Sequence, residues 1–324
     1  PPDSSRQWQR IILTPPHTAY LRISDGCDHT CSFCTIPSIR GKHHSRSIED
    51  NVREAEQLVC QGVRELNLIA QDSTAYGRDL TGRRMLPDLL KKLSTIEGLD
   101  WIRIHYAYPT EVTDELLECM ASTEKVVPYL DMPLQHASEK ILRLMRRPCS
   151  HDYLGGLIEK IRKTVPDISL RTTFIVGHPG ETEEDFSELV QFCREMEFDH
   201  AGCFVYSHEP DTVSGNLPNP VPSVIQQERF EVLTEINREI SEKKTASLIN
   251  TERDVLVDGE SDIFPDYFKG RHSGQAPDID GVVYVPRSEA EPGQMVRCRL
   301  TAAEGYDLFA QTVARCQESE FRRT

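Results

Sequence analysis

Three cysteines near the start of the chain have the spacing of metal ligands. Cys27, Cys31 and Cys34 follow one another as C-x3-C-x2-C. A cubane cluster contains four irons, so three thiolates leave one iron open to a substrate or cofactor, whereas structural zinc and closed ferredoxin-type clusters take four protein ligands. The spacing therefore predicts a reactive iron–sulfur cluster. The alternatives are three ordinary thiols or a zinc site completed by a nearby histidine, namely His29, His43 or His44.

Four sequence blocks, the first of which contains two of these cysteines, carry a wider resemblance. In chain order they read CSFCTIPSIRG (31–41), LIAQDSTAYG (68–77), MPLQHAS (132–138) and RTTFIVGHPGET (171–182). Together they resemble the methylthiotransferases of the radical S-adenosylmethionine (SAM) superfamily, over residues 17–314. Within that family, AQDSTAYG is more similar to the RimO branch, which modifies an aspartate of a small-subunit ribosomal protein, than to the MiaB branch.

The resemblance implies two cofactors. A 4Fe–4S cluster would be held by Cys27, Cys31 and Cys34, and the amino and carboxylate groups of SAM would chelate its open iron. One electron, supplied by a reducing protein, would split SAM into methionine and a 5′-deoxyadenosyl radical, which abstracts hydrogen from an unactivated carbon. For the full-length enzyme this implies methylthiolation of an aspartate side-chain carbon in a basic ribosomal protein. No catalytic side chain is assigned beyond the cluster ligands.

The resemblance also assigns SAM contacts to residues at predicted strand ends. Phe33, directly before the last cysteine, is an aromatic residue typical of the superfamily. Gln71 and Asp72 would accept hydrogen bonds from the ammonium group of SAM, and the alternative for Asp72 is a turn residue that caps the following loop. Gln135 would reach the ribose hydroxyls, with helix capping as the alternative.

The block at 171–182 supplies the remaining predicted contacts. Val176 and Gly177 match the adenine-binding turn of the family, where a glycine lets the backbone approach the adenine closely; a plain strand-ending turn is the alternative. Arg171 is a charged residue in an otherwise apolar run. It is therefore predicted to point into the barrel toward SAM or substrate, and an internal salt bridge is the competing interpretation.

Alternating strand and helix patterns are expected to position these residues. Strands are predicted at residues 19–23, 65–70, 101–106, 129–131, 170–176 and 201–206, with helices between them. Thr182 and Asp185 approximate a capping box at the start of a helix. Six strand–helix units imply an α/β fold with a parallel sheet. The resemblance specifies an open three-quarter (βα)6 barrel, with functional residues at the carboxyl ends of its strands.

The pattern changes after the barrel. Residues 1–16 are interpreted as a disordered segment or linker remnant, 17–249 as the radical SAM domain with a C-terminal connecting helix, 250–316 as a small all-β TRAM-type barrel, and 317–324 as a tail. Residues 250–324 hold 14 Asp and Glu against 9 Lys and Arg, a net charge of −5. An acidic module suits a basic protein partner better than it suits phosphates, unless the charge only maintains solubility. Asp278 and Asp280 are expected on an exposed loop.

Two other functions compete with this assignment. The first is a tRNA adenosine methylthiotransferase, with tRNA as the runner-up substrate, because TRAM modules are usually associated with RNA. The second is a binding protein whose cysteines hold a structural metal and whose β-module docks on the ribosome or RNA. The blocks at 71–72 and 171–181 favour the enzyme, since a structural metal site has no need of them.

Composition predicts a cytoplasmic protein. The 324 residues are 38% hydrophobic, and no apolar run approaches the roughly 18 residues of a membrane span. The amino terminus lacks the apolar stretch of a signal peptide. The ten cysteines are irregularly spread, which favours reduced thiols, and Cys60, Cys119 and Cys193 are predicted to fill the core. We expect a monomer that has no membrane partner.

The family resemblance further implies an N-terminal domain whose three cysteines hold a second 4Fe–4S cluster for sulfur delivery. Only a short polar, proline-containing segment precedes residue 17. The chain is therefore expected to lack that domain, to cleave SAM, and to be unable to insert sulfur alone.

Overall fold

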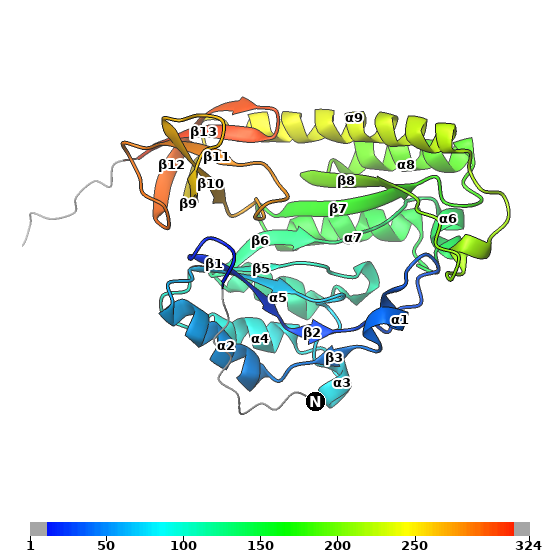
Figure 1. The fold of residues 1–324 in the computed structure, drawn as a ribbon, viewed down its shortest axis with the longest axis horizontal. Coiled ribbons are helices and arrows are strands. Elements are labelled where there is room, and N and C mark those ends of the chain that lie inside the picture. Colours follow the sequence, from blue (N-terminus) through cyan, green and yellow to red (C-terminus); the bar gives the residue numbers. More distant parts are fainter. Residues whose placement is uncertain (1–11, 314–324) are drawn as a thin grey trace, which may run out of the picture.

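An open barrel of parallel strands forms the larger part of the protein. A computed structural model describes residues 12–313, so most of the predicted linker remnant and all of the predicted tail lie outside the described residues. Six parallel strands pair in the order β1-β4-β5-β6-β7-β8 (Figure 1). They are β1 (Thr18–Arg22), β4 (Glu65–Ile69), β5 (Trp101–Ile104), β6 (Val126–Asp131), β7 (Ser169–Val176) and β8 (His200–Val205). No ladder joins β8 to β1 within residues 12–313, so the predicted open barrel is confirmed.

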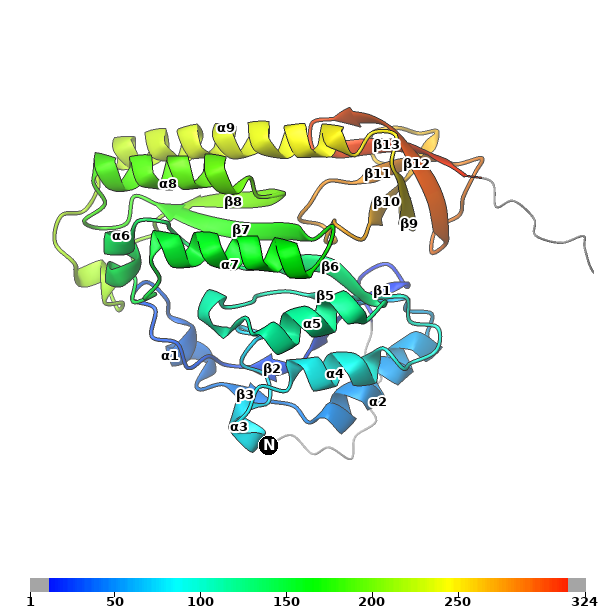
Figure 2. The same cartoon turned by 180° about the vertical axis from the view of Figure 1, so that it is seen from behind.

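Helices cover one face of this sheet, as Figure 2 shows. Thr182 and Asp185 form the predicted capping box at the start of α8. The helices are α2 (Ile48–Cys60), α4 (Leu86–Leu93), α5 (Asp114–Ser122), α6 (Glu139–Leu144), α7 (His151–Thr164) and α8 (Glu183–Met196), with short α1 (Ile36–Arg40) and α3 (Arg78–Thr81) in loops and two 3₁₀ turns at Pro109–Glu111 and Ser214–Asn216.

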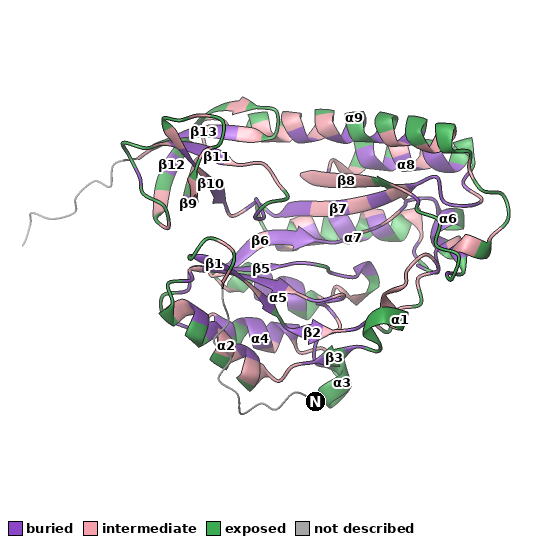
Figure 3. Ribbon diagram, in the orientation of Figure 1, coloured by how far each residue is buried: buried purple, intermediate pink, exposed green. Residues whose placement is uncertain are grey.

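The two faces of the sheet differ in polarity. Leu21, Leu66 and Leu68 are buried in the apolar core beneath the helices. Asn67 and Arg103, from the other face, are equally buried but polar. Because successive side chains of a strand point to opposite faces, one face builds the core and the other lines the barrel interior. Figure 3 shows how much of the sheet is buried in this way.

A small closed barrel follows the long helix α9 (Ser223–Ser247), which runs beside α8 and β8 in Figures 1 and 2. Its strands pair in the closed order β10-β11-β13-β12-β9. They are β9 (Glu252–Glu260), β10 (Tyr267–His272), β11 (Val283–Pro286), β12 (Met295–Glu304) and β13 (Asp307–Thr312). Val255, Val283 and Leu300 are among the side chains that fill its core. The predicted all-β barrel is confirmed.

The small barrel packs against the ends at which the parallel strands begin. Trp101 and Tyr129 of the open barrel form one apolar cluster with Leu256 and Ala276 of the small barrel. All four side chains are buried. This contact closes the amino-terminal end of the open barrel and leaves the carboxyl ends of its strands for a site.

A buried ionic cluster crosses the same junction. Glu65, at the start of β4, accepts hydrogen bonds from Arg103 on β5 (3.0 Å) and from Arg271 on β10 (2.7 Å). Arg271 also donates to Asp258 on β9 at 2.7 Å. Burial by itself would raise the pKa of Glu65, but the guanidiniums of Arg271 and Arg103 outweigh it and lower the pKa to about 2. The two barrels are therefore joined by charges as well as by apolar surface.

Two expectations about single side chains are wrong. The Asp280 side chain is fully buried and pairs with Arg171, because its loop turns inward against the open barrel; Asp278 on the same loop is exposed as predicted. Cys60 is exposed, whereas Cys119 and Cys193 are buried as predicted. Two residues along a helix correspond to a rotation of roughly 200°, so Cys60 lies almost opposite the buried Leu58.

None of the helices within residues 12–313 is both long and apolar enough to cross a membrane.

Candidate cofactor site

The three predicted metal ligands lie on one loop beyond the carboxyl end of β1. The loop leaves β2 (Ser24–Asp25), which pairs with β3 (His44–Ser45) and closes the loop at its base. Gly26 has a φ of +77°, and a Cβ at this position would lie 2.1 Å from the carbonyl oxygen of Lys42. Only glycine fits this close approach, so the residue that precedes the first cysteine is set by backbone geometry.

The thiols of this loop share one cavity. Cys27, Cys31 and Cys34 are free and partly buried, and all three line the same hollow. Burial raises the pKa of the Cys27 thiol to about 11 and also raises that of Cys34. Both thiols therefore need a bound cation to become thiolates near neutral pH.

Zinc and a cubane cluster make different demands on these residues. All ligands of zinc bind one ion, whereas each thiolate of a cubane binds a different iron. Within residues 12–313, no group of three or more His, Cys, Asp or Glu side chains is placed to hold a single metal ion. Uptake of iron or of zinc by the chain distinguishes the two.

The cavity beside the thiols has a volume of about 450 Å³. This lies in the range of small-molecule sites. Phe33, Gln71 and Gln135, three of the predicted SAM contacts, line it together with the thiols. The side-chain oxygen Oε1 of Gln71 is buried and has no hydrogen-bond partner in the described part of the chain. Buried acceptors are normally hydrogen-bonded, so Oε1 of Gln71 remains available to a hydrogen-bond donor.

Two cavity residues have strained backbone conformations. Tyr106 has a φ of +59° and Gln135 a φ of +74°. Gln135 is held there by β7, because its N–H donates to Thr173 O and its carbonyl accepts from Ile175 N, each at 2.8 Å. Such strain costs on the order of 1–3 kcal/mol per residue and clusters at functional sites.

Asp72 does not line the cavity and is occupied by local contacts. One carboxylate oxygen accepts from the backbone N–H groups of Thr74 (2.9 Å) and Ala75 (3.2 Å), and the other lies 2.7 Å from Nε2 of His29. Burial would raise the pKa of Asp72, but hydrogen bonds from His29 and Thr74 lower it overall. The hydrogen bonds from Thr74 and Ala75 are those expected if Asp72 caps the following loop. Its predicted hydrogen bond with the ammonium group of SAM stays a prediction.

Arg171 also lies outside the cavity lining. Its Nη1 donates to Asp280 Oδ1 at 2.5 Å, which is the internal salt bridge of the competing interpretation. Burial would lower the pKa of Arg171, but the carboxylate of Asp280 outweighs it and raises the pKa. Its predicted contact with SAM therefore has no support from the cavity geometry and stays a prediction.

The predicted adenine turn is held from two sides. The Val176 side chain is buried in the core on the helix side of the sheet. Gly177 has a φ of +77°; its N–H donates to Glu181 Oε2 at 2.7 Å, and its carbonyl accepts from Gln226 Nε2 on α9 at 2.9 Å. Neither Val176 nor Gly177 lines the cavity of the thiols, so their contact with an adenine stays a prediction.

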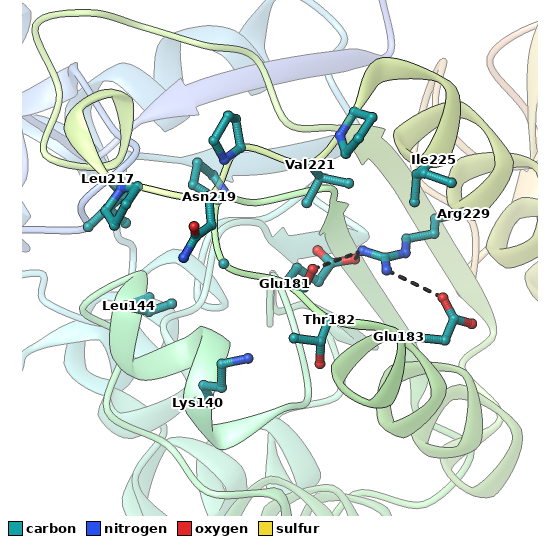
Figure 4. A pocket seen from close by; sticks show the side chains of 15 residues that line it. Lys140, Leu144, Glu181, Thr182, Glu183, Leu217, Asn219, Val221, Ile225 and Arg229 are labelled. Carbon is teal, nitrogen blue, oxygen red and sulfur yellow. Dashed lines mark hydrogen bonds and ion pairs between the residues drawn. The ribbon is translucent and has the colours of Figure 1, made fainter.

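A second hollow, of about 670 Å³, lies beyond this turn between α6, the start of α8 and the chain that enters α9 (Figure 4). Arg229 pairs there with Glu181 at 2.9 Å and with Glu183 at 3.4 Å. Burial raises the pKa of Glu181 to about 7, although Arg229 opposes the rise. None of the predicted site residues lines this hollow, and its wall includes Pro218 and Pro220. The cavity at the cysteines is the better cofactor site.

The sequence analysis assigned no cofactor contact to five polar residues that line the cysteine cavity. They are Arg22, His29, Tyr106, Tyr108 and Arg147. His29 stands inside the cysteine motif, which could have marked it as more than an alternative zinc ligand. Tyr108 and Arg147 come from loops after β5 and α6, where no spacing pattern points to a ligand.

Comparison with known proteins identifies the family. The Radical SAM superfamily matches residues 21–193, and the TRAM domain matches residues 249–313. The protein named "Ribosomal protein uS12 methylthiotransferase RimO" from Symbiobacterium thermophilum is 47% identical over 96% of this chain, which covers 65% of that relative. A relative of the same name from Geobacter sulfurreducens is 45% identical over 94% of this chain, which covers 68% of it.

The chain belongs to the RimO family of radical SAM methylthiotransferases. It spans 65% of the length of the S. thermophilum relative and 63% of that of a relative from Sorangium cellulosum.

Solved radical SAM structures share the fold of this RimO family member. TsrM, a radical SAM methyltransferase from Kitasatospora setae, superposes with a TM-score of 0.52 at 17% identity, covering 61% of this chain and 38% of TsrM. Coproporphyrinogen III oxidase (HemN) from Escherichia coli gives 0.51 at 18% identity, covering 80% of this chain and 68% of HemN. At these identities the likeness shows the fold alone.

TsrM was solved with a 4Fe–4S cluster bound and, in a second structure, with a SAM analog bound. The residues of this RimO family member fit both cofactors. Three thiols on one loop line the cavity together with Phe33, Gln71 and Gln135.

Proposed function

We propose that this chain holds a 4Fe–4S cluster through Cys27, Cys31 and Cys34, binds SAM in the adjoining cavity, and forms the radical-generating part of a methylthiotransferase. The observation that supports this most is that three free thiols line one cavity of about 450 Å³ together with Phe33, Gln71 and Gln135. When bound, the cluster and SAM supply a carbon radical that can abstract hydrogen from an unactivated carbon.

The chain's own residues would orient SAM and keep water away. Gln71 would accept a hydrogen bond from the SAM ammonium group, and Phe33 and Gln135 would shape the walls beside it. Such positioning supplies the alignment that radical chemistry needs. The adenine contact at Val176 and Gly177 rests on the family resemblance alone, because neither residue lines this cavity and the Gln226 side chain covers Gly177.

Two predicted contacts would act through their partners. Asp72 holds His29, which lies in the cavity wall, and Arg171 holds Asp280 at the junction of the two barrels. We therefore propose a supporting role behind the cavity wall for Asp72, whereas Arg171 supports the junction at the other end of the open barrel.

As substrate we propose a basic small-subunit ribosomal protein, in which a methylthio group replaces one hydrogen on an aspartate side-chain carbon. Two RimO relatives are named for ribosomal protein uS12. The net charge of −5 in residues 250–324 suits a basic partner. Asp278 is exposed and available to such a partner, whereas Asp280 is buried. The enzyme would act as a monomer in the cytoplasm, and a reducing protein would supply the electron.

The test has two stages. After anaerobic reconstitution with iron and sulfide, the chain should release 5′-deoxyadenosine from SAM when a strong one-electron reductant is added. The basic ribosomal protein and tRNA are then exposed in parallel to the chain and to the full-length S. thermophilum relative. With the full-length relative, we expect the mass of the ribosomal protein to rise by the difference between one methylthio group and the hydrogen that it replaces. Zinc binding without iron uptake would contradict the first stage, and modification of tRNA alone would favour the tRNA branch.

A further inference from the structure

A buried guanidinium lies against one of the three thiols. Arg147, in the segment after α6, is 7% exposed. Its Nη1 lies 3.6 Å from Cys31 Sγ and can donate a hydrogen bond to the sulfur. No carboxylate of the described residues pairs with Arg147, whose hydrogen bonds are to the sulfur and to a backbone carbonyl. Within residues 12–313 no acidic side chain therefore neutralises its positive charge, which lies beside the thiol.

Neutral groups hold this guanidinium in place. Nη2 of Arg147 donates to the carbonyl oxygen of Pro133 at 2.7 Å. The guanidinium carbon lies 4.3 Å from the centre of the Tyr108 ring, in a cation–π contact. Both contacts restrict the side chain without cancelling its charge.

The Tyr108 ring is itself braced against the cysteine loop. His29, between the first two cysteines, stacks on Tyr108 with ring centres 3.6 Å apart and an angle of 9° between the planes. A stacked imidazole occupies one face of the ring, so the guanidinium of Arg147 lies over the other. Nε2 of His29 is 2.7 Å from Asp72 Oδ2, and Thr74 Oγ1 joins Asp72 to the backbone N–H of Tyr108. The contacts form a closed ring that fixes Arg147 relative to the thiols.

We propose that Arg147 is a positioning residue that raises the reduction potential of the cluster by holding a positive charge beside the Cys31 sulfur. This rests on the proposed function, because it needs a cluster at the three thiols. Reduction places one additional electron on the cluster and its thiolates, and no bond is made or broken. A fixed cation in a partly buried site stabilises that added negative charge. The reduced state is therefore favoured more than it would be by three thiolates alone.

Three variants of the full chain test this. Each is reconstituted anaerobically, its iron is counted, and the reduced fraction is followed by electron paramagnetic resonance as the solution potential is lowered. In Arg147→Gln the ratio of reduced to oxidised cluster at a given potential should fall about tenfold, which corresponds to about 59 mV for a one-electron couple. Arg147→Lys retains the charge and should stay within about threefold of the unsubstituted chain.

Arg22→Gln is the matched control. Arg22 lines the same cavity, but its side chain is 58% exposed and its contact is with Asp25 rather than with a thiol. Solvent screens its charge, so the ratio should change by less than about threefold.

The outcomes are distinct. An unchanged ratio in Arg147→Gln, with the full iron content, would overturn the proposal. Arg147→Gln could instead lose the cluster while Arg147→Lys keeps it, with the same ratio of reduced to oxidised cluster as the unsubstituted chain. That result would support the proposal, because the positive charge is then what the cluster needs. Loss in both variants with an unchanged melting temperature of the metal-free chain would overturn it, since the shape of arginine rather than its charge would matter. Failure of the unsubstituted chain to take up iron would instead overturn the proposed function.

Discussion

Arg171 on β7 donates a hydrogen bond to Asp280 of the small barrel, 2.5 Å away. The Asp280 side chain is fully buried, and its second oxygen accepts from the Tyr129 hydroxyl at 2.9 Å and from the backbone N–H of Ala276 at 2.8 Å. Burial would raise the pKa of Asp280, but His200 and Arg171 lower it. A carboxylate that the sequence places on an exposed acidic loop thus closes the amino-terminal end of the open barrel.

Asp280→Asn should destabilise the protein by roughly 3–5 kcal/mol, because it leaves the largely buried Arg171 without its anionic partner. Urea unfolding at neutral pH measures this. Asp278→Asn, two residues earlier on the same loop, is the matched control and should change stability by less than about 0.5 kcal/mol, since its side chain is exposed. Equal effects of the two substitutions would show that the Arg171 pair does not stabilise the junction.

Glu65→Gln should also destabilise the protein by roughly 3–5 kcal/mol near pH 6, because Arg103 and Arg271 lose their shared anion. The folded-state pKa of Glu65 is about 2, below the usual value of 4.5. Its contribution is therefore fully present above about pH 4.5 and is lost as pH falls toward 2.

The difference in unfolding free energy between the unsubstituted chain and Glu65→Gln should consequently become smaller as the pH falls from 5 to 3. Glu139→Gln, which breaks an exposed pair with Arg143 on α6, should cost less than about 0.5 kcal/mol at each pH. A constant difference between the chain and Glu65→Gln over this range would refute the lowered pKa.

Gln71→Leu should weaken SAM binding to the reconstituted chain at least about tenfold, because the ammonium group of SAM would lose an acceptor and be buried against an apolar side chain. Its melting temperature should hardly change, since Oε1 of Gln71 has no partner in the described residues. Calorimetric titration with SAM measures the affinity. Gln61→Leu, at the exposed end of α2, is the control. Unaltered SAM affinity in Gln71→Leu would place the ammonium group elsewhere.

Gly177→Ala should destabilise the chain by roughly 1–3 kcal/mol, because a non-glycine residue would be held at a φ of +77°. The new Cβ would also lie 2.4 Å from Cγ of Gln226. Adding Gln226→Ala should therefore restore part of the stability but not all of it, since the backbone strain persists. Full recovery in the double variant would mean that the clash alone matters, and no loss in the single variant would contradict the geometry of this turn.

Cys31→Ala should abolish cluster assembly, because two thiolates hold a cubane poorly. Iron and sulfide per chain after anaerobic reconstitution measure this, with about four of each expected for the unsubstituted chain. Cys60→Ala removes an exposed thiol at the end of α2 and should keep the full iron content. A Cys31→Ala variant that still binds four irons would show that the three cysteines are not the cluster ligands.

The sequence by itself determined the chemistry of the site and the order of the elements. Cys27, Cys31 and Cys34 are close in the chain, so the loop that carries them brings the thiols to one cavity whatever surrounds it. The strand and helix patterns are likewise local, and alternation of strands with helices leaves a parallel sheet as the compact solution. Gln71 and Gln135 follow strands, and the parallel sheet carries both to the same edge as the cysteines.

Only the tertiary structure decided the partners of the charged residues. Arg171 and Asp280 are 109 residues apart, His29 and Asp72 are 43 apart, and Arg147 and Cys31 are 116 apart. Sequence periodicity reports which neighbours share a face of a helix or strand, and carries no information about a partner that another element brings close. A buried charge must find such a partner, because leaving it unpaired costs more than turning the side chain toward one. The docking of the small barrel thus directed Arg171 to Asp280, and the loop after α6 brought Arg147 to Cys31.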